Sequence, residues 1–305
     1  MKKKAFLITR IAVTAALLIY LLNKYAVSDI WSALKTIDPL FFLLSILASL
    51  SGIIFSSLQN RQIAGILNIK FTTIESVKIS LISLFYSLTM PGEIGGAIAK
   101  WAKFKEHGAS TGNSLSLLLI SRYFYSFVLI ILSIFSFSVD NPFRISGLQP
   151  IAISLAAVSL LSAVMLLQPS IANTMLRKFP LLLTPVRQIN GASALQKTYF
   201  FIFPLASQTA GLIAFFFMLH ALNIELSLSS AFWIMGASAI IQMAPIHIGG
   251  FGVREVSLIY FLSLFSIPGH EALALSTASV ISRLVISLIG GFLELSHLRR
   301  KIKNG

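Results

Sequence analysis

The sequence lacks cysteine and carries little charge. Without cysteine, the chain forms no disulfide, has no thiolate nucleophile and cannot build a cysteine–zinc site. Only 11% of its 305 residues are charged, whereas a soluble domain has about twice that fraction. It also has no HExxH zinc motif, no phosphate-binding loop and no dinucleotide-binding glycine fingerprint, so we expect no metal and no cofactor. These absences disfavour a soluble enzyme.

The residues that are present are mostly apolar. Hydrophobic residues make up 56% of the chain, and the mean hydropathy is +0.86. Several apolar runs approach the roughly 20 residues that a helix needs to cross a bilayer. The composition therefore predicts an all-α, polytopic membrane protein. We expect about six spanning helices, over residues 5–22, 40–58, 112–137, 150–167, 199–222 and 272–295, and an amphipathic interfacial segment over residues 27–38.

The basic residues predict the orientation of the chain. The net charge is +14, but lysine and arginine lie in short segments between apolar runs, which favours anionic headgroups over nucleic acid as partners. Basic clusters near both ends predict cytoplasmic N- and C-termini, and we expect the cytoplasmic (inner) membrane of a prokaryote. We also interpret Lys70 and Lys103 as cytoplasmic loop residues. The segment between them, residues 71–102, must then enter the membrane and return.

Two related motifs interrupt the apolar sequence. Residues 90–100 read MPGEIGGAIAK and residues 244–255 read APIHIGGFGVRE, so both contain Pro-x-x-Ile-Gly-Gly with a basic residue nine positions after the proline. Because proline and paired glycines break helices, the motifs predict re-entrant hairpins over residues 71–102 and 229–265. Full crossings remain an alternative for the second interruption. The expected hairpin-tip residues are Pro91, Gly92, Gly95, Gly96, Pro245, Gly249, Gly250 and Gly252.

The two motifs also define a repeat. Alignment of the prolines brings Ser121-Arg122 into correspondence with Ser282-Arg283 after a short insertion. The repeat units, residues 71–137 and 229–295, begin on opposite sides of the predicted membrane, so the repeat is inverted. Inverted repeats with broken helices that meet near mid-depth are typical of secondary transporters. We expect one transmembrane domain over residues 1–305 and no soluble catalytic domain.

Charged residues within apolar segments are the candidate substrate-binding residues. Each costs at least ~2.5 kcal/mol at the centre of a spanning helix, so its retention needs a reason. One reason is ion pairing that locks the hairpins to the long helices; the other is a polar path with excess positive charge, suited to a phosphate-bearing headgroup. Arg122 and Arg283 are the leading candidates because their depth leaves little room to reach the interface. The full set is Glu93, Lys100, Arg122, His247, Arg254, Glu255 and Arg283.

The motifs carry a family resemblance. MPGEIGGAIAK with the following ISR, and APIHIGGFGVREVSLIYF with the following ISRLV, resemble the two signatures of the lysylphosphatidylglycerol synthase transmembrane-region family, often described as flippase-like. The resemblance covers nearly the whole chain. It implies a membrane module that helps lipids to move between leaflets. The soluble domain that makes aminoacylated lipid in fused members has no counterpart in these residues.

Three functions remain open from the sequence. The leading hypothesis is a flippase-like translocase that moves an anionic, aminoacylated or polyprenyl-linked lipid between leaflets. The alternative is an integral membrane enzyme that modifies a lipid headgroup or lipid-linked sugar, with Glu93 and Glu255 as acid and base. A non-transporting partner of a lipid-synthesis enzyme is the third. Helix faces rich in small residues permit a homodimer, and the sequence leaves lipid identity, transport direction and energy coupling open.

Overall fold

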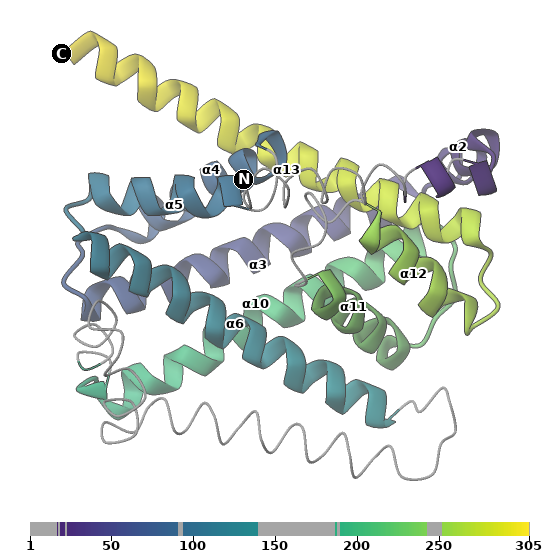
Figure 1. Ribbon diagram of the computed structural model, residues 1–305, viewed down its shortest axis with the longest axis horizontal. Coiled ribbons are helices and arrows are strands. Elements are labelled where there is room, and N and C mark those ends of the chain that lie inside the picture. The colour runs from purple at the N-terminus through teal and green to yellow at the C-terminus, as the bar shows by residue number, and fades with distance from the viewer. Residues whose placement is uncertain are drawn as a thin grey trace, which may run out of the picture.

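The computed structural model describes residues 17, 19–21, 23–90, 94–139, 187, 190–242 and 252–304. Every regular element within these ranges is a helix (Figure 1). In chain order the helices are α2 (Val27–Lys35), α3 (Pro39–Ile66), α4 (Thr73–Thr89), α5 (Ile94–Glu106), α6 (Thr111–Val139), α10 (Ala194–Ala221), α11 (Leu228–Gln242), α12 (Val253–Ser263) and α13 (Gly269–Asn304).

Four of the described helices are long and apolar enough to cross a membrane. They are α3, α6, α10 and the Gly269–His297 part of α13. The predicted class, an all-α polytopic membrane protein, is therefore confirmed. The predicted spans over residues 5–22 and 150–167 lie wholly or largely outside the described residues, so the number of spans stays a prediction.

Helices α3 and α10 pack in antiparallel directions through the middle of the molecule (Figure 1). The Ser45 hydroxyl donates to the Ala214 carbonyl at 2.7 Å, and the Ser207 hydroxyl donates to the Gly52 carbonyl at 2.8 Å. A Cβ at Gly52 would lie 3.2 Å from the Ser207 carbonyl, so the glycine permits this close approach. Small residues with interhelical hydrogen bonds are the usual means of holding helices together in lipid, at about 0.6 kcal/mol per bond.

Two buried clusters cover opposite ends of this central pair. The first gathers Phe104 of α5, Phe124 of α6 and Phe200 of α10, and the second gathers Trp233 of α11, Leu262 of α12 and Leu275 of α13. Each cluster thus joins one short hairpin helix to a long helix. The scaffold holds both interrupted segments against the same central helices.

Helix α2 has the expected amphipathic character. Its Ile30, Ala33 and Leu34 pack against the second cluster, whereas Val27 and Trp31 are exposed. An exposed tryptophan on a short amphipathic helix is typical of a membrane interface. The interfacial position stays a prediction, since no membrane is part of the structure.

Several helices extend beyond their predicted bounds. Helix α3 continues to Ile66, eight residues past the predicted end, so Arg61 is a helical residue. Helix α5 continues to Glu106, which makes the prediction of a loop at Lys103 wrong: this lysine is helical and only 8% exposed. Helix α13 has 36 residues and extends beyond the body of the molecule toward the C-terminus (Figure 1). At 1.5 Å per residue it is roughly 54 Å long, which exceeds the bilayer core.

Candidate functional site

The first interruption separates two helices that pack against each other as a hairpin. A Cβ added at Gly95 would lie 2.7 Å from the Tyr86 carbonyl, and one at Gly96 would lie 2.7 Å from the Ser83 carbonyl. The Ser83 hydroxyl donates to the Gly96 carbonyl at 2.8 Å. The start of α5 therefore contacts the last turns of α4, and the paired glycines permit that contact. Pro91, Gly92 and Glu93 lie outside the described residues.

The second interruption also separates two packed helices, α11 and α12. Helix α12 begins after Gly252, whose φ of 82° is in the left-handed region that favours glycine. The backbone N–H of Gly252 donates to the Glu255 carboxylate at 2.6 Å and so caps the helix. The other predicted tip residues and the histidine, Pro245, His247, Gly249 and Gly250, lie outside the described residues. The approach of the two tips at mid-depth stays a prediction.

Arg254 and Glu255 form a buried cluster with Ser276 of α13. The Arg254 guanidinium donates to the Ser276 hydroxyl at 2.6 Å, to the Ser276 carbonyl at 2.9 Å and to the Glu255 carboxylate at 3.1 Å. The Ser276 hydroxyl donates in turn to the Glu255 carboxylate at 2.6 Å. Both charged residues are under 10% exposed. This cluster is an ion pair of the kind that locks a hairpin to a long helix, and it fastens the second hairpin to α13.

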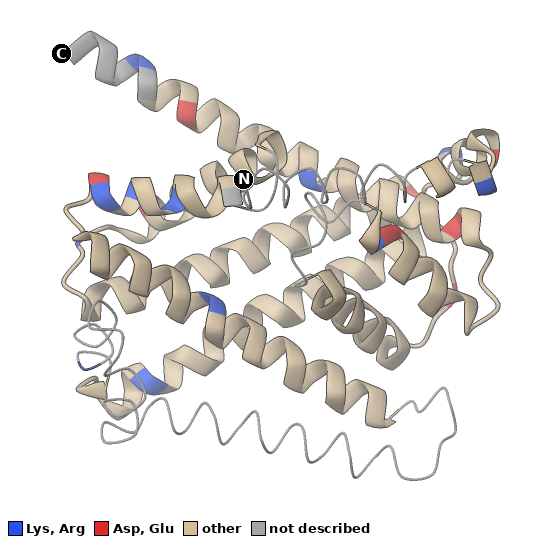
Figure 2. Cartoon of the chain, viewed as in Figure 1, with Lys and Arg blue, Asp and Glu red and all other residues tan. Residues whose placement is uncertain are grey.

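A second charged cluster fastens the first hairpin to the same helix. The Lys103 ammonium of α5 lies 2.9 Å from the Glu294 carboxylate of α13 and 3.3 Å from the Glu106 carboxylate. The Tyr86 hydroxyl of α4 donates to the other oxygen of Glu294 at 3.3 Å. Glu294 therefore contacts both arms of the hairpin. Figure 2 shows how charged residues gather on α5, in contrast to the almost uncharged central helices.

Three cations, each from a different helix, lie in succession: Lys100 lies near Arg122, and Arg122 and Arg283 both lie near Tyr125. Lys100 belongs to α5, Arg122 to α6 and Arg283 to α13. The Arg122 guanidinium is close enough to Lys100 and to Tyr125 to act on both electrostatically, and Arg283 acts on Tyr125. Both arginines also engage in interactions of their own. The structure thus brings together Lys100, Arg122 and Arg283, three of the predicted site residues; we call them the cation cluster.

The residues of the cation cluster lie at mid-helix positions and are not buried. Lys100 is half-buried, and Arg122, Arg283 and Tyr125 are exposed. Arg122 and Arg283 each lie near the middle of a helix that is long and apolar enough to cross a membrane, α6 and α13 respectively.

Buried amides hold the Arg122 region of α6 in place. The Ser121 hydroxyl donates to the Asn60 side-chain carbonyl at 2.8 Å, and the Gln59 amide of α3 reaches the Ser121 carbonyl at 3.5 Å. From α10, the Gln208 amide donates to the Tyr125 carbonyl at 2.9 Å. All three amide residues are 2% exposed or less. They fix the turn of α6 that carries Arg122 and Tyr125, so the cation cluster sits on a rigid frame.

Sequence reasoning missed several of these residues. Glu294 was detectable, because an acid in the apolar last span needs a partner. The amides Gln59, Asn60 and Gln208 within spanning helices gave a similar, weaker signal. Ser276 gave none, since serine is common in membrane helices and its role depends on its position opposite Arg254.

Comparison with known proteins assigns the family. A search of curated proteins finds no match. The family "Lysylphosphatidylglycerol synthase TM region" matches residues 7–291, which is nearly the whole chain and includes both interrupted segments and the cation cluster. The family relates the chain to the handling of membrane lipids. The chain is a multi-pass membrane protein that belongs to the lysylphosphatidylglycerol synthase TM region family.

Proposed function

We propose that this protein is a flippase-like translocase, in which the cation cluster binds a phosphate-bearing lipid headgroup as it crosses the membrane. The observation that carries the proposal is that Arg122 lies near Lys100 and that Arg122 and Arg283 both lie near Tyr125. Charged residues near mid-span are costly in lipid and are often functional, and a phosphate-bearing headgroup is a ligand that cations of this kind bind.

The charge of the cluster matches a phosphate in transit. A headgroup phosphate in hydrocarbon needs charge-assisted hydrogen bonds to replace its water, and guanidinium groups supply them in pairs. The Lys100 ammonium is a compact charge on a flexible stem, so it can stay in contact with an anion that changes position. Binding that is favourable but shared among several cations permits both capture and release. The inverted repeat that the sequence predicts would let the cluster face either leaflet in turn.

The alternative, a membrane enzyme, receives less support from the candidate acid and base. Glu255 already accepts hydrogen bonds from the Gly252 backbone, from Ser276 and from Arg254. Both oxygens of this carboxylate are therefore engaged within the protein, in the cap of α12 and in its attachment to α13. Glu93 lies outside the described residues.

Lipid transfer in proteoliposomes tests the proposal. Purified protein is reconstituted with a fluorescent phosphatidylglycerol, and a membrane-impermeant reductant bleaches the label in the outer leaflet. Functional protein moves label from the inner leaflet and so increases the bleached fraction. We expect Arg122→Gln and Arg283→Gln each to slow the transfer about tenfold or more, as loss of a charge-assisted contact predicts.

The matched control is Lys35→Gln, which removes a cation from α2 at a site remote from the cluster in sequence. It is expected to leave the transfer rate unchanged. Thermal unfolding in detergent verifies that each variant is folded. Transfer at the wild-type rate by both folded arginine variants rejects the proposed role of the cluster. Protein without any transfer activity that converts a lipid donor to product would favour the enzyme.

A further inference from the structure

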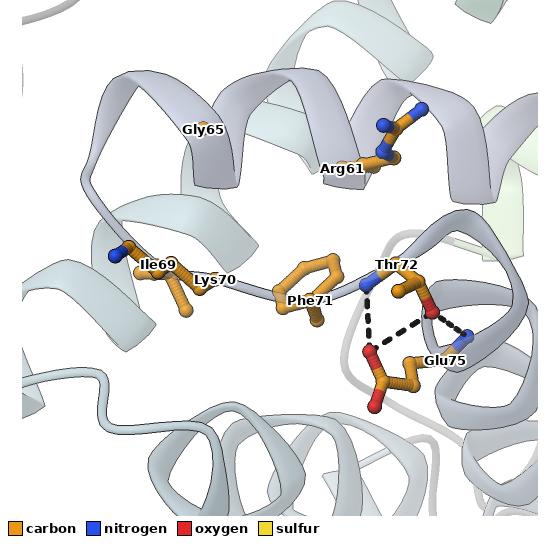
Figure 3. Close-up of a pocket in the computed structure, with 7 residues that line it drawn as sticks. All are labelled: Arg61, Gly65, Ile69, Lys70, Phe71, Thr72 and Glu75. Atoms are coloured by element: carbon orange, nitrogen blue, oxygen red, sulfur yellow. Dashed lines mark hydrogen bonds between the residues drawn. The ribbon is translucent and has the colours of Figure 1, made fainter.

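The turn between α3 and α4 forms a second cationic feature, away from the cation cluster. An open depression of about 460 Å³ lies there, lined by Arg61 and Gly65 of α3, by Ile69, Lys70, Phe71 and Thr72 of the turn, and by Glu75 of α4. Figure 3 shows α3 along one side of the depression and the turn along the other, with Phe71 between the two basic residues. The depression lies at the C-terminal end of α3, a helix that is long and apolar enough to cross a membrane. The end of a spanning helix is where lipid headgroups are expected.

The frame of the depression is rigid. Leu67 and Ile69 are buried, and Asn68 adopts a φ of 57° that ends α3 in a left-handed residue. The Ile69 N–H donates to the Ala64 carbonyl at 2.8 Å, and the Asn113 amide of α6 donates to the Leu67 carbonyl at 3.0 Å. The turn is therefore fixed before a ligand arrives, which lowers the ordering cost of binding.

The net charge of the depression is positive because two basic residues, Arg61 and Lys70, outnumber its one acid, Glu75. The Glu75 carboxylate accepts from the Thr72 backbone N–H at 2.6 Å and from the Thr72 hydroxyl at 2.9 Å (Figure 3). Its other oxygen lies 3.8 Å from the Nε2 atom of His107. Arg61 and Lys70 are both exposed. Within the described part of the chain, neither of them has a carboxylate partner.

We infer that this depression binds a phosphate anion between Arg61 and Lys70. A phosphate presents several strong acceptor oxygens, and it can receive paired N–H groups from a guanidinium and a separate contact from an ammonium. Both side chains have long flexible stems, and Phe71 adds an apolar surface to the lining. The site differs from the cation cluster in residues and in depth. The inference therefore holds or fails independently of the translocase proposal.

Two sources of phosphate fit this chemistry, a lipid headgroup and a soluble phosphate compound. Retention of phosphatidylglycerol is measured by native mass spectrometry of protein released from nanodiscs that contain phosphatidylglycerol and phosphatidylcholine. Binding of inorganic phosphate is measured by isothermal titration of the protein in phosphatidylcholine nanodiscs. The test variant is Arg61→Gln/Lys70→Gln. The control Lys78→Gln/Lys105→Gln removes the same charge from exposed positions on α4 and α5 that do not line the depression.

We expect the test variant to weaken phosphatidylglycerol retention or phosphate affinity about tenfold relative to the control variant. Loss in the nanodisc arm alone assigns the site to a lipid headgroup, and loss in the titration arm assigns it to a soluble phosphate. Equal effects of the test and control variants would show that the anion responds to the overall positive charge of the protein and not to the depression. That result would overturn the inference. Wild-type behaviour of the test variant in both arms overturns it as well.

Discussion

The Lys103 ammonium and the Glu294 carboxylate lie 2.9 Å apart and are both almost buried, although 190 residues of sequence lie between them. Their ion pair joins α5 of the first hairpin to the last spanning helix. Removal of Lys103 leaves Glu294 with only the Tyr86 hydroxyl as a described side-chain partner. Removal of Glu294 instead leaves Lys103 with Glu106 at 3.3 Å. The two substitutions should therefore differ in cost.

We expect Lys103→Met to lower the free energy of unfolding by about 3 kcal/mol, the cost of stranding a buried charge. Glu294→Leu should cost less, because Glu106 still compensates Lys103. The double variant should be more stable than the sum of the single effects predicts. Chemical unfolding in detergent measures all three. Strictly additive losses would show that the pair contributes nothing as a pair.

Ser276→Ala should destabilise the attachment of the second hairpin to α13. The substitution removes a hydroxyl that accepts from Arg254 and donates to Glu255, both of which stay buried. The expected loss is about 2 kcal/mol. Ser279→Ala is the matched control, because the Ser279 hydroxyl bonds only to its own helix among the hydrogen bonds of the described residues. Equal unfolding free energies for the two variants would contradict the proposed attachment.

Gly96→Ala should separate the arms of the first hairpin. The new methyl group would lie 2.7 Å from the Ser83 carbonyl and 2.9 Å from the Ser87 Cβ, so α4 and α5 must shift. The expected cost is about 1–3 kcal/mol. Gly65→Ala, where a Cβ meets nothing within 4 Å, should be neutral or stabilising by up to ~1 kcal/mol. Thermal unfolding of both variants checks the contrast, and a neutral Gly96→Ala would argue against tight packing of the hairpin.

Stability should fall in acid partly through Glu75. The Thr72 backbone N–H and hydroxyl stabilise the charged carboxylate and hold the pKa of Glu75 below its usual value of 4.5. The folded state therefore binds this proton less readily than the unfolded state, so the contribution is complete above about pH 4.5 and is lost as the pH falls through the lowered pKa. The wild-type advantage over Glu75→Gln should shrink over that range. An advantage that is constant from pH 7 to pH 3 in thermal unfolding would contradict the linkage.

The sequence supported the class and the hairpins through local physics. Long apolar runs in a membrane protein almost always form spanning helices. Paired glycines after a proline in such a run indicate either an interruption of the helix or a close contact between two helices. The contact of Gly96 with Ser83 confirms that close approach. The helix ends were less predictable. The sequence predicted a loop at Lys103 because a lysine at the end of an apolar run fits two locations equally well. It can lie in a loop at the membrane surface, or it can form a buried ion pair within a helix.

The partners of buried charges were beyond sequence reasoning. Arg254 could belong to a substrate path or to a structural ion pair, and the choice depends on which residues contact its guanidinium. One of these residues, Ser276, is 22 residues away on another helix. The gathering of Lys100, Arg122 and Arg283 likewise depends on how three helices cross. Depth along a helix can be counted from a sequence, but the direction in which a side chain faces depends on packing.

The attachment of both hairpins to one helix has a mechanical consequence. Helix α13 binds the second hairpin through Ser276 and the first through Glu294, and these contacts are roughly 27 Å apart along a continuous rod. A tilt or slide of this rod shifts both broken segments at once. Because both attachments lie on one helix, we expect the two hairpins to move together rather than separately.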